Sequence, residues 1–389
     1  MRRKRHSLAI GIAAAVFGLL SVHGPARAQS TEFKIGWVLP LIGPVAETAK
    51  AFIDGSEVAI AMINDAGGIG GLKARIIICD SQNQEQQAVI CTKKLINDDQ
   101  VNLLLGATGT PPTVAILPTV EAAGIPTFAI AAGSVAWEPV KKWVFKSIAA
   151  NDDQIPAEMD FLKLRGWTHA ALIRDNSVFG KDTSDIVHAM AKQYGVDIVA
   201  DEIYSPTDTD VTAQVTRLRA LNPDIVLNLA QNLTAAVLVS KKILQLGMKT
   251  PIMLGTNNVV DSYARLVPAA VEQSYFAGSK LVLKELPAND KLYGTITAFL
   301  KRYKEMRGAD AKPTAITIPV ADVLLLTATV AKPLGAKVLD RAALRDAIEG
   351  AHGIPGLQGV WTFSPTEHGS SLADGVVVVR YDNGEWKIP

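Results

Sequence analysis

Segments typical of strands and of helices alternate along the chain from about residue 33 onward, and this alternation constrains the fold most. The strand segments are short, continuous apolar runs, and the segments between them carry apolar residues at helical spacing. Parallel strands that are covered by helices on both faces have this uniformly apolar composition. The sequence therefore predicts an α/β fold with two doubly wound parallel-sheet lobes.

The first series of predicted elements precedes residue 130. Its strands are expected at 33–39, 75–79, 102–105 and 127–129, and its helices at 46–66, 85–97 and 113–123. The second series begins near residue 151. Its strands are expected at 169–173, 197–203, 225–229 and 252–254, and its helices at 154–164, 181–194, 211–221 and 233–246. Further helices are predicted at 288–307, 319–331 and 341–349, followed by a C-terminal hairpin whose turn is Asp382-Asn383-Gly384.

The size and composition of the chain exclude several classes of protein. A length of 389 residues suits two domains. With 48% hydrophobic and 20% charged residues, the chain is not of the disordered class. A net charge of +1 argues against a broadly basic nucleic-acid binder, so no nucleic-acid partner is expected.

Residues 1–28 have the layout of a secretory signal peptide. Basic residues 2–5 precede a fifteen-residue apolar stretch at 8–22, and Ala26-Arg27-Ala28 offers a cleavage site after Ala28. The alternative is a membrane anchor, but the apolar stretch is shorter than the roughly 20 residues that span a bilayer. Removing the five basic residues of this segment leaves 34 basic and 38 acidic residues, a net charge of −4. We expect an exported protein that is soluble outside the cytoplasm.

Export would place the two cysteines in an oxidising compartment, where a disulfide can form between them. Cys79 ends a predicted strand, and Cys91 lies on the following predicted helix, which can fold back onto that strand. This favours a disulfide between Cys79 and Cys91, the alternative being two buried free thiols. A metal site is disfavoured, because neither cysteine has a histidine or second cysteine at ligand spacing.

Catalytic and cofactor motifs are missing from the sequence. The glycines at 67–71 follow a predicted helix, whereas a dinucleotide-binding loop follows a strand, so they are interpreted as a helix stop and turn. No phosphate-binding loop or nucleophile elbow occurs. We therefore expect no enzyme activity, no cofactor and no metal. The predicted function is that of a ligand receptor in which two facing α/β lobes close on a ligand.

Several stretches carry a family resemblance. Residues 35–44 (IGWVLPLIGP), 63–69 (INDAGGI), 124–126 (GIP), 175–180 (DNSVFG) and 356–359 (GLQG) occur in order along the chain. Together they resemble the periplasmic solute-binding proteins of ABC importers with the type I fold, in the family that binds leucine, isoleucine and valine or other hydrophobic amino acids and aromatic acids. The resemblance covers essentially the whole chain after the signal segment.

The resemblance implies two lobes joined by three crossings. Lobe 1 would comprise residues 31–149 plus 277–355, and lobe 2 residues 150–276 plus 356–389. It also implies a monomer that delivers a small-molecule ligand to an ABC permease in the inner membrane. The alternative functions are a branched-chain amino acid or amide binder of the same fold, a sensory ligand receptor and an exported enzyme.

The resemblance also suggests ligand-binding residues. In lobe 1, Thr110 occupies the position of a carboxylate-binding hydroxyl, although it can equally cap the helix that follows it. The next loop offers the carbonyl of Ala131, with Gly133 at the position of the expected hydroxyl residue and Ser134 as a substitute one residue later.

In lobe 2, Phe179 stands where an aromatic residue closes over the ligand, and Gln231 follows the strand predicted at 225–229. Asn257 stands where amino-acid binders carry an acid that pairs with the ligand ammonium, with Asp261 and Glu202 as other sources of that charge. Because a buried unpaired ammonium is strongly disfavoured, these residues predict a small carboxylate with an apolar or aromatic body, or an amide, rather than a branched-chain amino acid.

Overall fold

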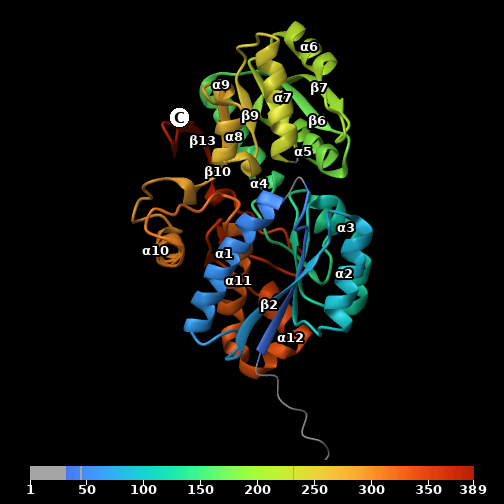
Figure 1. Ribbon diagram of the computed structural model, residues 1–389, viewed down its shortest axis with the longest axis vertical. Coiled ribbons are helices and arrows are strands. Elements are labelled where there is room, and N and C mark those ends of the chain that lie inside the picture. The colour runs from blue at the N-terminus through green and yellow to red at the C-terminus, as the bar shows by residue number, and fades with distance from the viewer. Residues whose placement is uncertain (1–31, 44–45, 231) are drawn as a thin grey trace, which may run out of the picture. The chain divides into compact units, whose positions relative to one another are not determined.

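The computed structural model describes residues 32–43, 46–230 and 232–389. The predicted signal peptide at 1–28 and the predicted site residue Gln231 lie outside the described residues. Residues Glu32–Pro389 form one compact unit, which contains two large sheets with helices packed around them (Figure 1) and a small two-stranded sheet.

The first sheet has five parallel strands in the order β2-β1-β3-β4-β5. Each strand is rich in apolar residues, and β1 is largely buried because it lies inside the sheet. The strands are β1 (Glu32–Leu39), β2 (Lys73–Asp80), β3 (Leu103–Thr108), β4 (Thr127–Ile130) and β5 (Val144–Lys146).

Six helices belong to this part of the unit. α1 packs against α11 through an apolar face, and α2 packs against α3 (Figure 1). The helices are α1 (Ala46–Asp65), α2 (Glu85–Asn97), α3 (Thr110–Ala123), α10 (Tyr293–Arg307), α11 (Ile318–Ala331) and α12 (Arg341–Glu349).

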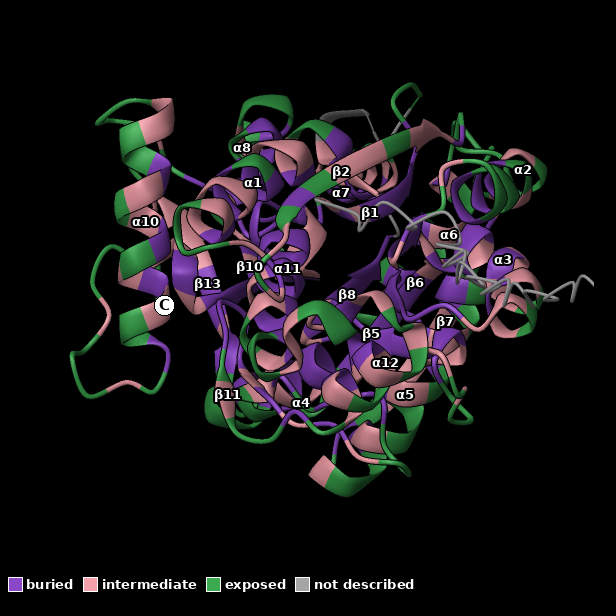
Figure 2. Ribbon diagram, turned by 90° about the horizontal axis from the view of Figure 1, so that it is seen from below, coloured by how far each residue is buried: buried purple, intermediate pink, exposed green. Residues whose placement is uncertain are grey.

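The second sheet has seven strands in the order β14-β13-β10-β9-β8-β6-β7. Strands β6 to β10 are parallel, and Figure 2 shows β6 and β8 in the colour of buried residues. β13 pairs with β10 in antiparallel fashion, and β14 pairs with β13. The strands are β6 (His169–Asp175), β7 (Asp197–Tyr204), β8 (Ile225–Leu229), β9 (Ile252–Leu254), β10 (Ser274–Ser279), β13 (Val376–Asp382) and β14 (Glu385–Lys387).

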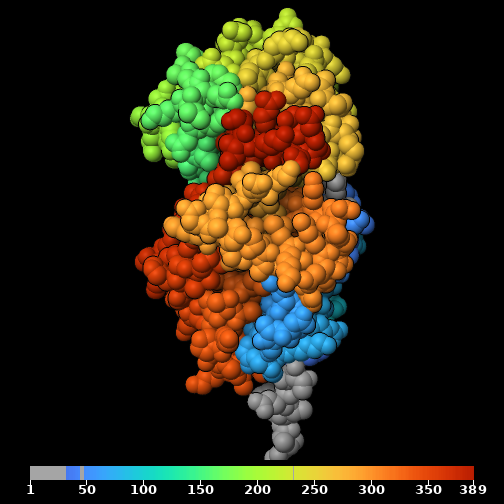
Figure 3. All heavy atoms as spheres, turned by 90° about the vertical axis from the view of Figure 1, so that its left-hand side faces the viewer, coloured from blue at the N-terminus to red at the C-terminus, as the bar shows by residue number. Residues whose placement is uncertain are grey.

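The predicted α/β fold with parallel sheets is confirmed, with one correction. The C-terminal hairpin is an antiparallel extension of the second sheet, so that sheet is mixed. In Figure 3 this segment, in red, reaches the surface. The helices around this sheet are α4 (Asn151–Arg165), α5 (Val178–Tyr194), α6 (Thr212–Leu221), α7 (Leu233–Gln245), α8 (Asp261–Leu266) and α9 (Pro268–Val271).

The segment between α12 and β13 packs on the first sheet. It contains the short strands β11 (Ile354–Pro355) and β12 (Val360–Trp361). Phe363 contacts Phe145 of β5 with ring centroids 5.3 Å apart, and His368 stacks on the same ring. His368 also shares a hydrogen bond with the carbonyl of Val144. These contacts tie residues 363–368 to β5, far away in the sequence.

One helical stretch, Ile318–Leu339, is long and apolar enough by composition to cross a membrane, and 56% of its most apolar window is buried. Its first part is α11, which packs against α1 and α12. Burial against neighbouring helices therefore accounts for its apolar composition, as in the core helix of a globular unit.

A disulfide joins Cys79 of β2 to Cys91 of α2, with Cα atoms 5.5 Å apart. β2 is an edge strand of the first sheet. The cross-link holds this edge against the helix that covers it, and the pairing is the one that the sequence favours.

Candidate functional site

A pocket lies where strands of both sheets end. Its lining includes the last residues of β3, β4, β8 and β10, namely Thr108, Ile130, Leu229 and Ser279. The carboxyl ends of parallel strands are the usual ligand-binding edge of open α/β sheets. Its volume is about 170 Å³, counted as space open to the centre of a water molecule. A cavity of about 150 Å³ is enough to hold benzene, so this pocket has room for a ligand of that order of size.

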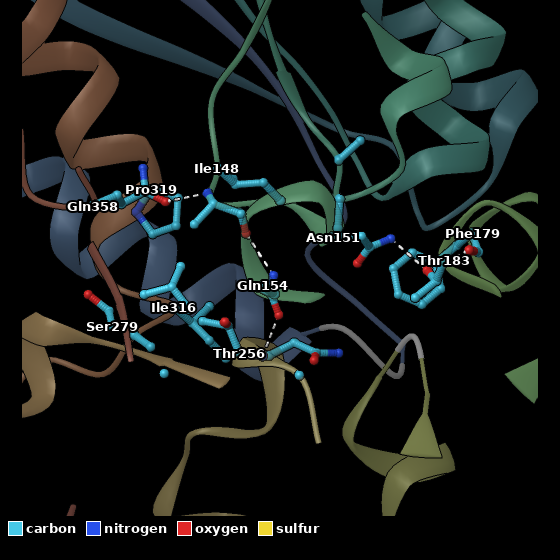
Figure 4. Close-up of a pocket in the computed structure, with 18 of the residues that line it drawn as sticks. Ile148, Asn151, Gln154, Phe179, Thr183, Thr256, Ser279, Ile316, Pro319 and Gln358 are labelled. Carbon is cyan, nitrogen blue, oxygen red and sulfur yellow. Dashed lines mark hydrogen bonds between the residues drawn. The ribbon is translucent and has the colours of Figure 1, made fainter. Parts of the chain in front are cut away.

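Most of the pocket wall is apolar, and part of it comes from α1 and the start of α11. Phe52, Ile148, Ile155, Ile316 and Pro319 belong to this apolar wall. Figure 4 labels three of them, Ile148, Ile316 and Pro319. Such surroundings favour an apolar ligand body and strengthen any polar contact made inside, because water is excluded.

Thr110 is the first residue of α3 and is buried beside the pocket. Its Oγ1 accepts a hydrogen bond from the Gly133 N–H at 3.1 Å, which leaves its hydroxyl proton available to a ligand. Pro111 and Pro112 follow and have no N–H to offer, while the Thr113 N–H is bonded to the Gly109 carbonyl. Within the described residues, the Thr110 N–H has no protein partner. Thr110 thus combines the two donors that a helix N-terminus presents to an anion.

Gly133 and Ser134 do not line the pocket. The Ser134 N–H and Oγ–H donate to the carboxylate of Asp182 at 3.0 and 2.8 Å. Ser134 begins the turn after β4 of the first sheet, whereas Asp182 lies on α5, which contacts strands of the second. Ser134 is therefore part of a bridge between the two sheets, and its hydroxyl is occupied.

Two predicted residues of the second sheet line the pocket. Phe179 is the second residue of α5, which begins after the cap residue Ser177, and its ring is mostly buried (Figure 4). Asn257 also lines the pocket, but its amide nitrogen donates to the Ala230 carbonyl and its oxygen accepts from Asn258. The other predicted residue in the lining is Ala131 of the loop after β4.

The two acids considered as substitutes for Asn257 lie elsewhere. Glu202 forms an ion pair with Arg217, and Asp261 interacts with Tyr381. Neither residue lines the pocket.

An acid that the sequence-based reasoning missed does line it. Glu158 is on α4 and only 2% exposed, and its Oε2 has no hydrogen-bond partner among the residues that the structure describes. Asn151, Gln154, Ile155 and Glu158 share one helix face, at i, i+3, i+4 and i+7. Burial raises the pKa of Glu158 to about 8, so the carboxyl is mainly protonated at neutral pH. The signal in the sequence was an acid in the predicted helix 154–164 that stands three residues after Ile155 and four before Leu162, on the same side of the helix.

Other buried polar atoms around the pocket also lack partners. They are Thr108 Oγ1, Asn228 Oδ1 and Thr256 Oγ1, all in lining residues. Buried polar atoms in folded proteins are nearly always bonded to protein, water or ligand. Their concentration here indicates that the pocket is built to surround a molecule with polar groups.

Two glutamines hold the chain where it leaves the first sheet. Gln358 accepts from the Ala149 N–H at 3.0 Å and donates to the Ser147 carbonyl at 2.9 Å. Gln154 donates to the Ala149 carbonyl at 2.7 Å and accepts from the Thr256 N–H at 3.0 Å (Figure 4). The chain between β5 and α4 is thus tied to both sides of the pocket.

A buried ion pair fixes the same segment. Lys146 is fully buried, and its Nζ lies 2.6 Å from Asp153 and 3.0 Å from Asp152. Asp153 also accepts from the N–H of Leu372, just before β13. Burial raises the pKa of Asp153 to about 6, and the Lys146 charge opposes this rise. The cluster joins two places where the chain passes between the sheets.

Comparison with known proteins agrees with this architecture. The family model described as "Periplasmic binding protein" matches residues 32–385. A Leu/Ile/Val-binding protein homolog 3 from Brucella melitensis is 25% identical over 274 residues, 69% of this chain and 73% of that protein. The Leu/Ile/Val-binding protein BraC3 from Rhizobium johnstonii is 24% identical over 199 residues, 50% of this chain and about half (53%) of that protein's length.

A solved structure supports the fold. The crystal structure of an extracellular ligand-binding receptor from Rhodopseudomonas palustris HaA2 superposes with a TM-score of 0.82. It is 23% identical, and the match covers 92% of this chain and 99% of that one. The matching family and the relatives are named as binding proteins, which confirms the prediction of a binding protein rather than an enzyme. The chain belongs to the periplasmic binding protein family, whose model spans both sheets and the pocket at their ends.

Proposed function

We propose that this protein is the substrate-binding component of an ABC importer and captures a small carboxylated ligand with an apolar or aromatic body. The observation that carries this proposal is the pocket at the ends of both sheets, which combines apolar walls with buried polar atoms that lack partners. The names of the two relatives support a small amino-acid-like ligand. Membership of a periplasmic family implies a periplasmic location, and we keep export with cleavage after Ala28 as part of the proposal.

Thr110 is the proposed anchor for the ligand carboxylate. Its hydroxyl and its N–H are neutral donors at the start of α3, and no Lys or Arg lines the pocket among the described residues. Ala131 lies beside this anchor, and Phe179 supplies an apolar contact from the other sheet. Gly133 keeps a supporting role, because its N–H orients the Thr110 hydroxyl.

We also propose that two lobes close on the ligand, each containing one of the sheets. The first lobe includes residues 31–149 and 277–355, and the second residues 150–276 together with the C-terminal hairpin. The contacts of residues 357–368 with Asp322, Ala149 and β5 favour moving this stretch, predicted in lobe 2, into lobe 1. The Ser134–Asp182 bridge would then join the lobes in the closed form. The unmodified ligand would pass to a membrane permease.

A thermal-shift panel tests the ligand class. The protein is unfolded and refolded to remove carried-over ligand, then melted with leucine, valine, phenylacetate or benzoate. A ligand at 100 times its dissociation constant stabilises the folded state by about 2.7 kcal/mol, which gives a clear rise in melting temperature. At least one member should raise it and be recovered unchanged by mass spectrometry. No shift with any of the four would refute the proposed ligand class.

A further inference from the structure

Glu158 is the one ionisable side chain among the described residues that line the pocket. It is buried, its Oε2 has no hydrogen-bond partner, and it lies on the face of α4 that carries Gln154 and Ile155 into the pocket. A buried carboxyl without a partner is unfavourable in either protonation state, and more so when it is charged. Such a group calls for a partner that the described part of the chain does not supply.

We propose that Glu158 binds the ammonium group of an amine-bearing ligand, and that ligand capture releases the Glu158 proton to the solvent. This inference rests on the proposed function and narrows its ligand class. The expectation against an amino acid depended on the missing acid at Asn257. Glu158 supplies an acid to the pocket from α4, the helix that follows the first segment between the two sheets.

The protonation change follows from the surroundings of Glu158. Burial alone raises its pKa to about 8, and no charged neighbour contributes to the rise. Without ligand, the carboxyl is therefore mostly neutral at pH 7. When a ligand ammonium enters, the attraction between opposite charges favours the carboxylate. The ammonium keeps its three protons, and the proton of the Glu158 carboxyl passes to water or buffer.

The elements packed against α4 do not supply a competing partner. These elements are α5, β10, β13 and the turn Ala373–Gly375. Asp182 on α5 is held by Ser134, Tyr275 on β10 contacts Arg165, and Asp374 in the turn pairs with Lys291. Arg380 on β13 shares the strand face of Val376, which lines the pocket, but lies four residues further along.

Matched ligand pairs test the assignment. Leucine and phenylalanine differ from 4-methylpentanoate and 3-phenylpropanoate only by the amine. Titration calorimetry of the full exported protein should show that the amine-bearing member of a pair binds more tightly. Between pH 6 and 8 its affinity should rise by up to about tenfold per pH unit, because the ionised fraction of Glu158 rises in that proportion. At pH 7, titrations in two buffers of different ionisation enthalpy should report about 0.9 proton released per ligand, from a pKa of about 8.

Glu158→Gln keeps the shape of the side chain and removes its charge. It should weaken binding of the amine-bearing ligand by about 30-fold or more and abolish the pH dependence, because an ammonium would lose its buried partner. Asp160→Asn is the matched control: Asp160 is exposed on the same helix, so this variant loses the same charge but should keep wild-type affinity and pH slope.

Three results would overturn the assignment. Equal or tighter binding of the deaminated acids would do so while leaving the proposed function intact. Absence of proton release from the wild-type protein would do so even if the Glu158→Gln variant failed to fold. Binding of neither member of either pair would overturn the assignment, and the proposed ligand class would fall with it only if the thermal-shift panel also showed no binding.

Discussion

Replacing Cys79 and Cys91 by alanine removes the cross-link between the edge strand β2 and helix α2. The two cysteines are 12 residues apart, so the bond closes a short loop. In the chain-entropy model, a loop of this size restricts the unfolded state enough to stabilise the folded protein by about 3 kcal/mol. Dividing this free energy by the unfolding entropy expected for residues 32–389 gives a fall in melting temperature of about 4 °C.

Differential scanning calorimetry of the oxidised protein, the double alanine variant and the wild type in reductant measures this effect. The variant and the reduced protein should melt at similar temperatures, both below the oxidised protein. Neither cysteine lines the pocket, so ligand affinity at 25 °C should stay unchanged. An unchanged melting temperature would refute the reasoning, and so would a drop confined to the variant, which would assign the loss to packing around the buried Cys91.

Two further predictions concern the segments between the sheets. Lys146→Met leaves Asp153 buried without its cation and should lower the free energy of unfolding by about 3–5 kcal/mol in urea titrations. Asp152→Asn changes a half-buried site and should lower it by less than about 1 kcal/mol. Similar losses from both variants would contradict the buried-pair argument. Ser134→Ala and Asp182→Asn should each weaken ligand binding about 3–10-fold. Because both remove the same bridge, their effects should be non-additive in a double-mutant cycle. Additive effects would show that the two residues act independently.

Elements with strong periodicity could be predicted from the sequence, and irregular ones could not. The predicted bounds of α2, β8, β9 and α12 agree with the structure. β5 and β10 were not predicted. β5 contains Lys146, whose burial depends on two aspartates that follow it, and β10 (Ser274–Ser279) is rich in small and polar residues. In both strands the tertiary partners, rather than local preference, decide the conformation.

Only part of the candidate site could be predicted from the sequence, for a related reason. Thr110, Ala131, Phe179 and Asn257 follow strand ends, and the structure brings them to one pocket. Ser134 also follows a strand end, but Asp182, 48 residues later, takes its hydroxyl. A sequence pattern shows which groups lie near an edge. It does not show which of them are already occupied.

Glu158 shows that the sequence also does not reveal which polar groups lack a protein partner. A single acid beside apolar residues of a helix is compatible with an ion pair, a water site or a ligand contact. Only the position of α4 beside the pocket and the absence of a protein partner for Oε2 separate these cases.

The antiparallel pairing of β13 with β10 has a consequence for the order of folding. Phe276 pairs with Val379, so a strand in the middle of the second sheet acquires one of its neighbours about 100 residues later. β13 and β14 are synthesised only after β10 and the roughly 100 residues that follow it. The second sheet therefore reaches its full width only after β13 and β14 have been synthesised, and until then β10 presents an open edge.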